Sequence, residues 1–195
     1  PDRGGGLPQA PASLGRGRPA RARPGAAEAA LWMGVLAHWR VPERAGYLLG
    51  TVRSLQAQAP QVSIAISTND GPAIAKVVGD LTSDARVFNT IPDASRFLLD
   101  RPGAIACVNW KPSPRTHPFR LTWHHKELFR DLAFHHHAFD HGLTHLVYTE
   151  DDLRFGPSAL RYWTRARPVL APHGLTPGFA RFEGPADDVR FTSQL

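Results

Sequence analysis

Three consecutive acids, Glu150, Asp151 and Asp152, are the residues that most clearly point to chemistry. They follow a predicted β-strand over residues 145–149, and ligands bind at the carboxyl ends of strands in an open α/β sheet. Adjacent carboxylates repel one another unless a cation or solvent relieves them. Such hard oxygen ligands suit Mg²⁺ or Mn²⁺, which complete their coordination shells with substrate phosphate oxygens. The alternative interpretation is a solvated acidic turn.

A second candidate metal site comes from the histidines of one short segment, which are His135, His136, His137, His141 and His145. His137 and His141 are four residues apart, so on a helix they would face the same way and could bind a transition metal through imidazole. A solvated helix face is the competing interpretation. We interpret His124 and His125 as structural.

Short apolar runs alternate with helical patterns from residue 29 onward, which is typical of βαβ units. The predicted strands cover residues 31–39, 62–67, 85–89, 104–110 and 145–149, with a late strand at 179–182. The predicted helices cover residues 42–58, 73–81, 92–101 and 122–141, and a further stretch from just after 157 to about 170. This pattern predicts an α/β fold with a mostly parallel central sheet and helices on both faces.

The chain has 195 residues and 42% apolar side chains, which suffices for one core of normal size. Residues 1–28 are rich in Arg, Pro and Gly, so we predict a disordered arm there and an α/β domain over 29–195. The arm carries five arginines against two acids, a charge of +3, which is half of the formal +6. The Gly-Arg-Gly-Arg-Pro stretch at 15–19 resembles an AT-hook, but its composition favours a linker or stem over a nucleic-acid partner.

Cys107 is the only cysteine, so the chain has no internal disulfide framework and no cysteine-based zinc site. The longest apolar run, residues 29–37, is about half of a membrane span. We therefore expect a cytoplasmic protein with no membrane span in this chain. Because the sequence begins at Pro1, removal of an upstream signal or anchor is compatible with it, as is truncation at the C-terminus.

The order of these elements resembles nucleotide-sugar glycosyltransferases of the GT-A type, in which an acidic DXD motif closes a strand of this kind. The similarity is strongest over Leu121-Thr-Trp-His-His-Lys126 and over residues 146–163, including Tyr162-Trp163. It implies a Rossmann-like fold and transfer of a sugar from a nucleoside-diphosphate sugar to a hydroxyl acceptor, such as a glycan. The implied cofactor is Mn²⁺ or Mg²⁺. At this length, part of the acceptor-binding half is expected to be abbreviated or absent.

The resemblance also assigns roles to the three acids. Asp152 becomes the direct metal ligand, while Glu150 contacts sugar or ribose hydroxyls or shares the metal through water. Asp151 could take either role. The first position holds Glu where the simplest family pattern has Asp, and its longer side chain puts direct coordination by Glu150 in doubt.

The nucleotide site is expected over the first strands. The resemblance maps the base and ribose to the end of the first strand near His38 and Arg40 and to the loop residues Ser67, Thr68, Asn69 and Asp70. The competing interpretation is a turn, because Asn-Asp-Gly-Pro is a strong turn signal.

The diphosphate and the acceptor base are expected farther along the chain. Lys126 and Arg130 lie four apart on a predicted helix and could reach a diphosphate, or form a solvated face paired with nearby acids. Glu183 is the candidate catalytic base, and Asp187 and Asp188 are the alternatives. The competing interpretation is that Glu183 is a surface acid with no catalytic role.

Two other classes of function fit parts of the sequence. A metal-dependent phosphoesterase or nuclease would use the acids together with the histidines. A non-enzymatic nucleic-acid-binding module would use the basic arm.

Overall fold

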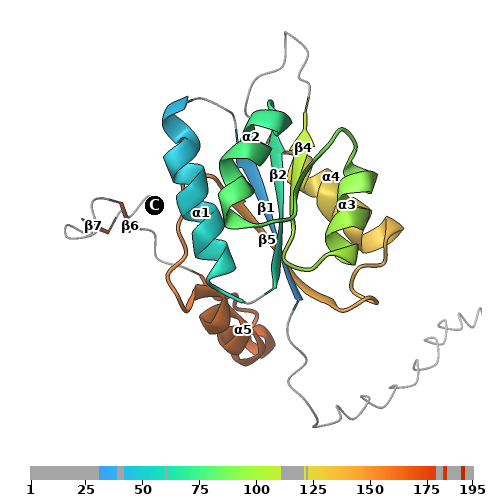
Figure 1. Ribbon diagram of the computed structural model, residues 1–195. Helices are drawn as coiled ribbons and strands as arrows, with labels where there is room; N and C mark the ends of the chain where they lie inside the picture. Colours follow the sequence, from blue (N-terminus) through green and yellow to red (C-terminus); the bar gives the residue numbers. More distant parts are fainter. Residues whose placement is uncertain are drawn as a thin grey trace, which may run out of the picture.

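The computed structural model describes residues 31–38, 42–59, 61–110, 121, 123–178, 182–183 and 190–191. Its main sheet has five strands, which are β1 (Leu31–His38), β2 (Val62–Thr68), β3 (Ala85–Phe88), β4 (Ile105–Asn109) and β5 (Leu143–Glu150). The strand order is β3-β4-β2-β1-β5, and every neighbouring pair is parallel (Figure 1). All carboxyl ends therefore meet at one edge, the upper one in Figure 1.

The α-helices connect these strands and follow the last of them. They are α1 (Ala45–Gln56), α2 (Gly71–Val78), α3 (Ile91–Asp100), α4 (His124–Arg130) and α5 (Ala159–Leu170). Short 3-10 turns are η1 (Pro42–Arg44), η2 (Gly79–Leu81) and η5 (Ala171–His173), and η4 (Asp131–His135) is a π-helical turn that continues α4. Two short strands, β6 (Phe182–Glu183) and β7 (Arg190–Phe191), form a separate antiparallel pair.

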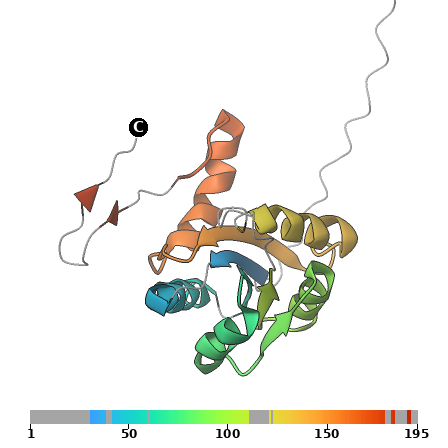
Figure 2. The same cartoon turned by 90° about the horizontal axis from the view of Figure 1, so that it is seen from above.

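The sheet is covered on both faces, as Figure 2 shows from above. On one face, Leu48 and Leu55 of α1 and Ile74 of α2 pack on the strands. On the other face, Leu98 of α3 and Leu128 of α4 do so. The predicted α/β fold with a mostly parallel sheet and helices on both faces is thus confirmed. Among the described residues, no helix has the length and apolar character needed to cross a membrane.

Side-chain caps fix where two of the helices begin. Asp70 precedes α2 and accepts a hydrogen bond from the backbone N–H of Ala73 at 3.1 Å. Thr90 caps α3 in the same way through the N–H of Asp93 at 3.4 Å. Each helix has proline in its first turn, where a missing N–H costs nothing.

Replacing Asp70 with Ala should lower the free energy of unfolding by about 1 kcal/mol, because α2 would lose its capping acceptor. Urea unfolding followed by circular dichroism measures this change. Asp80→Ala is the control, because Asp80 is exposed and its loss should change stability by less than about 0.5 kcal/mol. Equal effects of both substitutions would contradict a capping role for Asp70.

The prediction of one long helix over residues 122–141 is wrong in its second half. The α-helix ends at Arg130, η4 ends at His135, and His137 has a φ of +47°, which no right-handed helix accommodates. The Phe-His-His-His stretch at 134–137 consists of weak helix formers, which agrees with this early end. Thr122, the first residue of that predicted helix, and the arm over 1–28 lie outside the described residues.

Candidate functional site

The acidic motif and the end of β1 meet at the carboxyl edge of the sheet. Strand β5 pairs with β1 in a register that sets Glu150 opposite Ala37. The next residues on the two strands, Asp151 and His38, therefore come together although they are 113 positions apart in the sequence. Both side chains are almost fully buried.

Asp151 is held on several sides. Its Oδ2 forms a hydrogen bond with Nδ1 of His38 and accepts another from Nε of Arg44 at 3.1 Å. Nη2 of Arg44 bonds to Oδ1, so the guanidinium contacts both carboxylate oxygens. The Thr51 hydroxyl donates to the backbone carbonyl of Asp151 at 2.8 Å. Asp151 thus fastens β5 to β1, η1 and α1.

These contacts keep Asp151 ionised. Burial by itself raises the pKa of a carboxyl group, but the hydrogen bonds from His38 and Arg44 and their electrostatic attraction outweigh it. The net effect is that the pKa of Asp151 lies below its ordinary value. The same pairing raises the pKa of Arg44. Asp151 is therefore an acceptor whose two oxygens are both engaged, which leaves it poorly suited to bind a metal.

Glu150 and Asp152 differ from the acid between them because both are exposed. Glu150 is the last residue of β5, and Asp151 and Asp152 form the turn directly after it. Nη2 of Arg44 also lies 3.3 Å from Oδ2 of Asp152, a contact in which both side chains are 40% exposed. The first and third acids of the motif thus face solvent beside a guanidinium group. No cluster of three or more potential metal-ligating side chains occurs in the described part of the chain.

The predicted nucleotide residues at the end of β2 have structural roles. Thr68 is fully buried, and its Oγ1 accepts a hydrogen bond from the Asp70 N–H at 3.3 Å. Asp70 caps α2, so the turn interpretation of this loop applies to it. Asn69 is half-buried beside them. Arg40 lies outside the described residues.

The two predicted diphosphate residues, Lys126 and Arg130, do share one face of α4. They border a shallow depression of about 540 Å³, together with Phe129, Leu146 and Tyr148. Nζ of Lys126 lies 4.8 Å from the centroid of the Trp123 ring. Within the described part of the chain, no hydrogen bond or ion pair joins Lys126 or Arg130 to the acidic motif.

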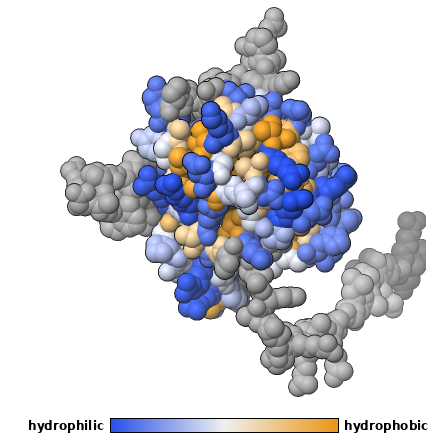
Figure 3. Space-filling view, in the orientation of Figure 1, coloured by the Kyte–Doolittle hydropathy of each residue, from blue (hydrophilic) through white to orange (hydrophobic). Residues whose placement is uncertain are grey.

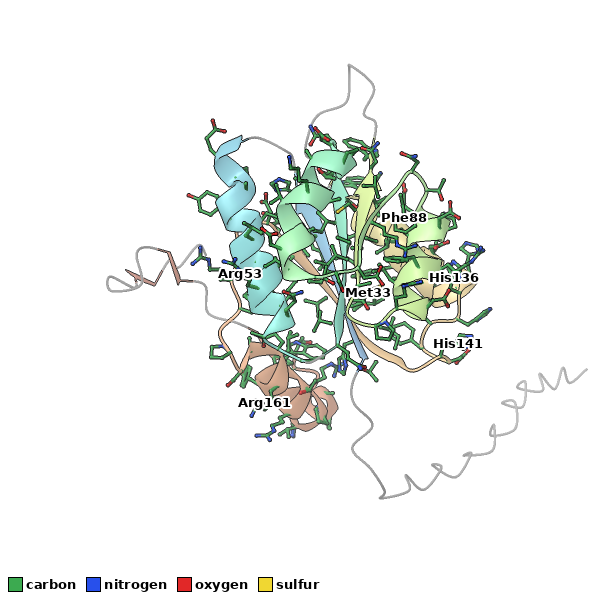
Figure 4. The ribbon with its side chains drawn as sticks, in the orientation of Figure 1. Met33, Arg53, Phe88, His136, His141 and Arg161 are labelled. Atoms are coloured by element: carbon green, nitrogen blue, oxygen red, sulfur yellow. The ribbon has the colours of Figure 1, made fainter. Side chains whose placement is uncertain are left out.

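The candidate base and the histidines are not gathered at this site. Glu183 belongs to β6 and pairs with Arg190 of β7, in a strand pair separate from the five-stranded sheet. His136 and His141 lie beside α3 and α4 (Figure 4), and His141 precedes the amino end of β5 rather than its carboxyl end. The prediction that His137 and His141 share a helix face is wrong, because neither residue is in a helix.

A pocket that the sequence did not predict opens at the ends of β3 and β4. It has a volume of about 390 Å³, and its polar lining consists of Asn89, Asn109, Trp110, His124 and Glu127. In the view of Figure 3, apolar residues gather toward this upper edge of the molecule, between hydrophilic residues on either side. Arg44 was missed as well, because nothing in its sequence neighbourhood links it to acids more than 100 positions away.

The comparisons with known proteins do not assign this chain to a family: no family model matches it, and no curated protein matches it.

Proposed function

We propose that this protein is a metal-dependent glycosyltransferase, which moves a sugar from a nucleoside-diphosphate sugar to an acceptor hydroxyl. One observation carries the proposal: the acidic motif stands at the carboxyl end of the parallel edge strand β5, beside β1, with Glu150 and Asp152 exposed and Asp151 anchored between them. This is the edge of an α/β sheet where ligands bind. The resemblance to GT-A enzymes supports the reaction class.

The exposed acids fit a divalent cation. Mg²⁺ is commonly bound by one or two carboxylates together with substrate phosphates, so a dedicated cage of three or more protein ligands is not required. Asp152 is the direct ligand in this proposal, and Glu150 binds the metal through water or contacts a sugar or ribose hydroxyl. Asp151 has a positioning role because Arg44 and His38 occupy its oxygens.

The cation would neutralise the diphosphate leaving group while the acceptor hydroxyl attacks the anomeric carbon. Arg44 contributes a further positive charge next to Asp152. Its Nε and Nη2 are bound to Asp151, which also binds His38 and so holds the guanidinium in place from the buried side. Glu183 remains the proposed base for an inverting reaction, and Lys126 and Arg130 remain proposed phosphate contacts.

The structure gives less support to a phosphoesterase or nuclease that combines the acids with the histidines. Glu150 ends β5, whereas His136 and His141 precede the start of that strand, eight residues long. Parallel pairing with β1 keeps β5 extended, so its two ends lie at opposite edges of the sheet. In the described residues, the two groups of side chains form no common site.

Calorimetry with UDP and GDP, each with and without Mn²⁺, tests the proposed function. We expect at least one nucleotide to bind in the presence of Mn²⁺ and to bind much more weakly with EDTA. If neither nucleotide shows metal-dependent binding and CDP shows none either, the proposal is wrong and a hydrolase becomes the better hypothesis. A steep salt dependence of DNA binding that vanishes on deletion of residues 1–28 would instead favour a nucleic-acid-binding module.

A further inference from the structure

The pocket at the ends of β3 and β4 is lined from one face of the sheet. Its walls come from α3 and α4, which follow these two strands and pack on the same face. Ligands of α/β proteins bind at the carboxyl ends of the strands, which is where this pocket lies. The volume of about 390 Å³ is within the range of small-molecule sites.

Two amide groups in this pocket hold each other in place. Nδ2 of Asn109 donates to Oδ1 of Asn89 at 3.3 Å, and Oδ1 of Asn109 accepts the backbone N–H of Gly71 at 3.2 Å. A Cβ atom on Gly71 would come within 3.2 Å of the Cβ of Asn109. The glycine therefore lets α2 approach closely enough to fix the amide of Asn109. Asn89 uses its oxygen for this bond, and its NH₂ group is the donor of that side chain.

Helix α4 supplies the opposite wall of the pocket. His124 and Glu127 are three residues apart and share one helix face. The Nδ1 atom of His124 is buried and has no hydrogen-bond partner among the described residues. Burial lowers the pKa of His124, although the charge of Glu127 opposes the shift, so the imidazole is neutral near pH 7. Glu127 is exposed at the rim as a hydrogen-bond acceptor.

The chemistry of the lining selects an uncharged aromatic ring with polar edges. No lysine or arginine is among the described lining residues, so nothing there favours a phosphate group. The rings of Trp110 and His124 meet edge to face, with centroids 5.2 Å apart and an interplanar angle of 76°. Aromatic side chains bind bases by stacking. Asparagine amides and glutamate carboxylates are the groups that read the edges of bases, and glutamate accepts from the amino group of cytosine.

We propose that this pocket binds a nucleobase that carries an exocyclic amino group, with Glu127 as acceptor for that group and Asn89 as donor to the base. The inference rests on the proposed function, in which the base belongs to the sugar donor. The ends of β4 and β5 are three strand spacings apart, about 14 Å. An extended nucleoside diphosphate can span that distance to the acidic motif. In this arrangement the base lies at the end of β4, one strand away from the end of β2. The resemblance had instead assigned the base to residues that follow β2, among them Asn69 and Asp70.

The test compares cytidine with uridine, because cytidine has an amino group on C4 and an acceptor at N3, whereas uridine has an oxygen on C4 and an N–H at N3. Binding to the full chain is followed by amide NMR titration in EDTA, so no diphosphate or metal contributes. We expect cytidine to bind about tenfold more tightly than uridine. Shifts should concentrate on the amides of β4 and α4.

Two substitutions and one control make the test specific. Glu127→Gln should remove the preference for cytidine, because an amide can also donate to the oxygen of uridine. Asn89→Ala should weaken both nucleosides about tenfold. Neither residue is buried, so both variants should fold. Asp80→Asn removes an exposed acid outside the described pocket lining and should bind like the parent protein.

The outcomes separate this inference from the proposed function. Equal affinity for cytidine and uridine, or unchanged binding in Glu127→Gln, would overturn the inference. The inference would also be overturned if methyl glucoside bound at these residues and neither nucleoside did. A cytidine preference without any metal-dependent binding of CDP or GDP would support the pocket and contradict the glycosyltransferase. Metal-dependent UDP binding that leaves the amides of β4 and α4 unshifted would support the glycosyltransferase and contradict the base pocket.

Discussion

Asp151→Asn should lower the free energy of unfolding by about 2–3 kcal/mol at pH 7. Breaking a buried ion pair by removing one partner typically costs about 3–5 kcal/mol. The expected loss is smaller here because the side chain of Arg44 is 40% exposed and solvent screens part of its charge. Asparagine also presents an NH₂ group to partners that need an acceptor. Urea unfolding measured by circular dichroism gives the difference between variant and parent.

The pH dependence of this loss provides its own check. Because the folded state lowers the pKa of Asp151, the stabilisation is fully present above the unfolded pKa of about 3.9. It disappears as the pH falls through the folded pKa. The gap between parent and variant should therefore be widest at neutral pH and should narrow below about pH 4. A gap that stays constant from pH 7 to pH 3 would show that Asp151 does not act through its charge.

Asp84 offers a matched control for this experiment. It also contacts two arginines, Arg101 at 2.9 Å and Arg86 at 3.4 Å. Both arginine side chains are at least half exposed. Asp84→Asn should therefore cost less than about 1 kcal/mol. If Asp151→Asn and Asp84→Asn lower the free energy of unfolding by similar amounts, the burial of Asp151 beside His38 adds nothing to stability.

Asp152→Asn should reduce metal-dependent nucleotide affinity by about a hundredfold while the fold survives. The substitution keeps the size of the side chain but removes the charge that the proposed site needs to hold the cation against the diphosphate. Stability should change by less than about 0.5 kcal/mol, because the contact with Arg44 is solvent-exposed. Calorimetry with nucleotide and Mn²⁺, beside a thermal melt without ligand, measures both quantities.

The control for this variant is Asp140→Asn, which removes an acid that is 82% exposed and near the amino end of β5. It should bind nucleotide and Mn²⁺ like the parent protein. If Asp152→Asn also binds both normally, Asp152 has no role in holding the metal, and the motif is a solvated acidic turn.

The sequence predicted most elements of the fold but not the order of its strands. Runs rich in apolar residues located β1 and β2 to within one residue, although Ser63 interrupts the second run. The order of strands cannot be obtained in this way, since β4 inserts between β2 and β3 through contacts distant in sequence. The predicted helix over residues 122–141 was too long, because a π-helical turn and a left-handed residue end it before the next glycine.

The candidate site was predictable only in part, and for the same reason. The acid triplet was visible in the sequence, but not which of its members is buried, because Asp151 and Asp152 lie in the turn after β5 rather than in the strand. What the sequence could not supply was the partner of the buried acid. Arg44 and His38 reach Asp151 only because β5 pairs with β1, and that pairing depends on the whole fold.

The contact between His38 and Asp151 also has a kinetic consequence. Strands β1 and β2 pair across a connection of one helix, whereas β1 and β5 pair only after more than 100 residues have been brought together. Contacts of such long sequence separation form slowly, because loop closure costs entropy before any bond compensates it. During synthesis β5 emerges after the other four strands of the sheet. The acidic site is therefore assembled late, and a folding intermediate with four paired strands would already have the pocket of β3 and β4 but not the carboxylates.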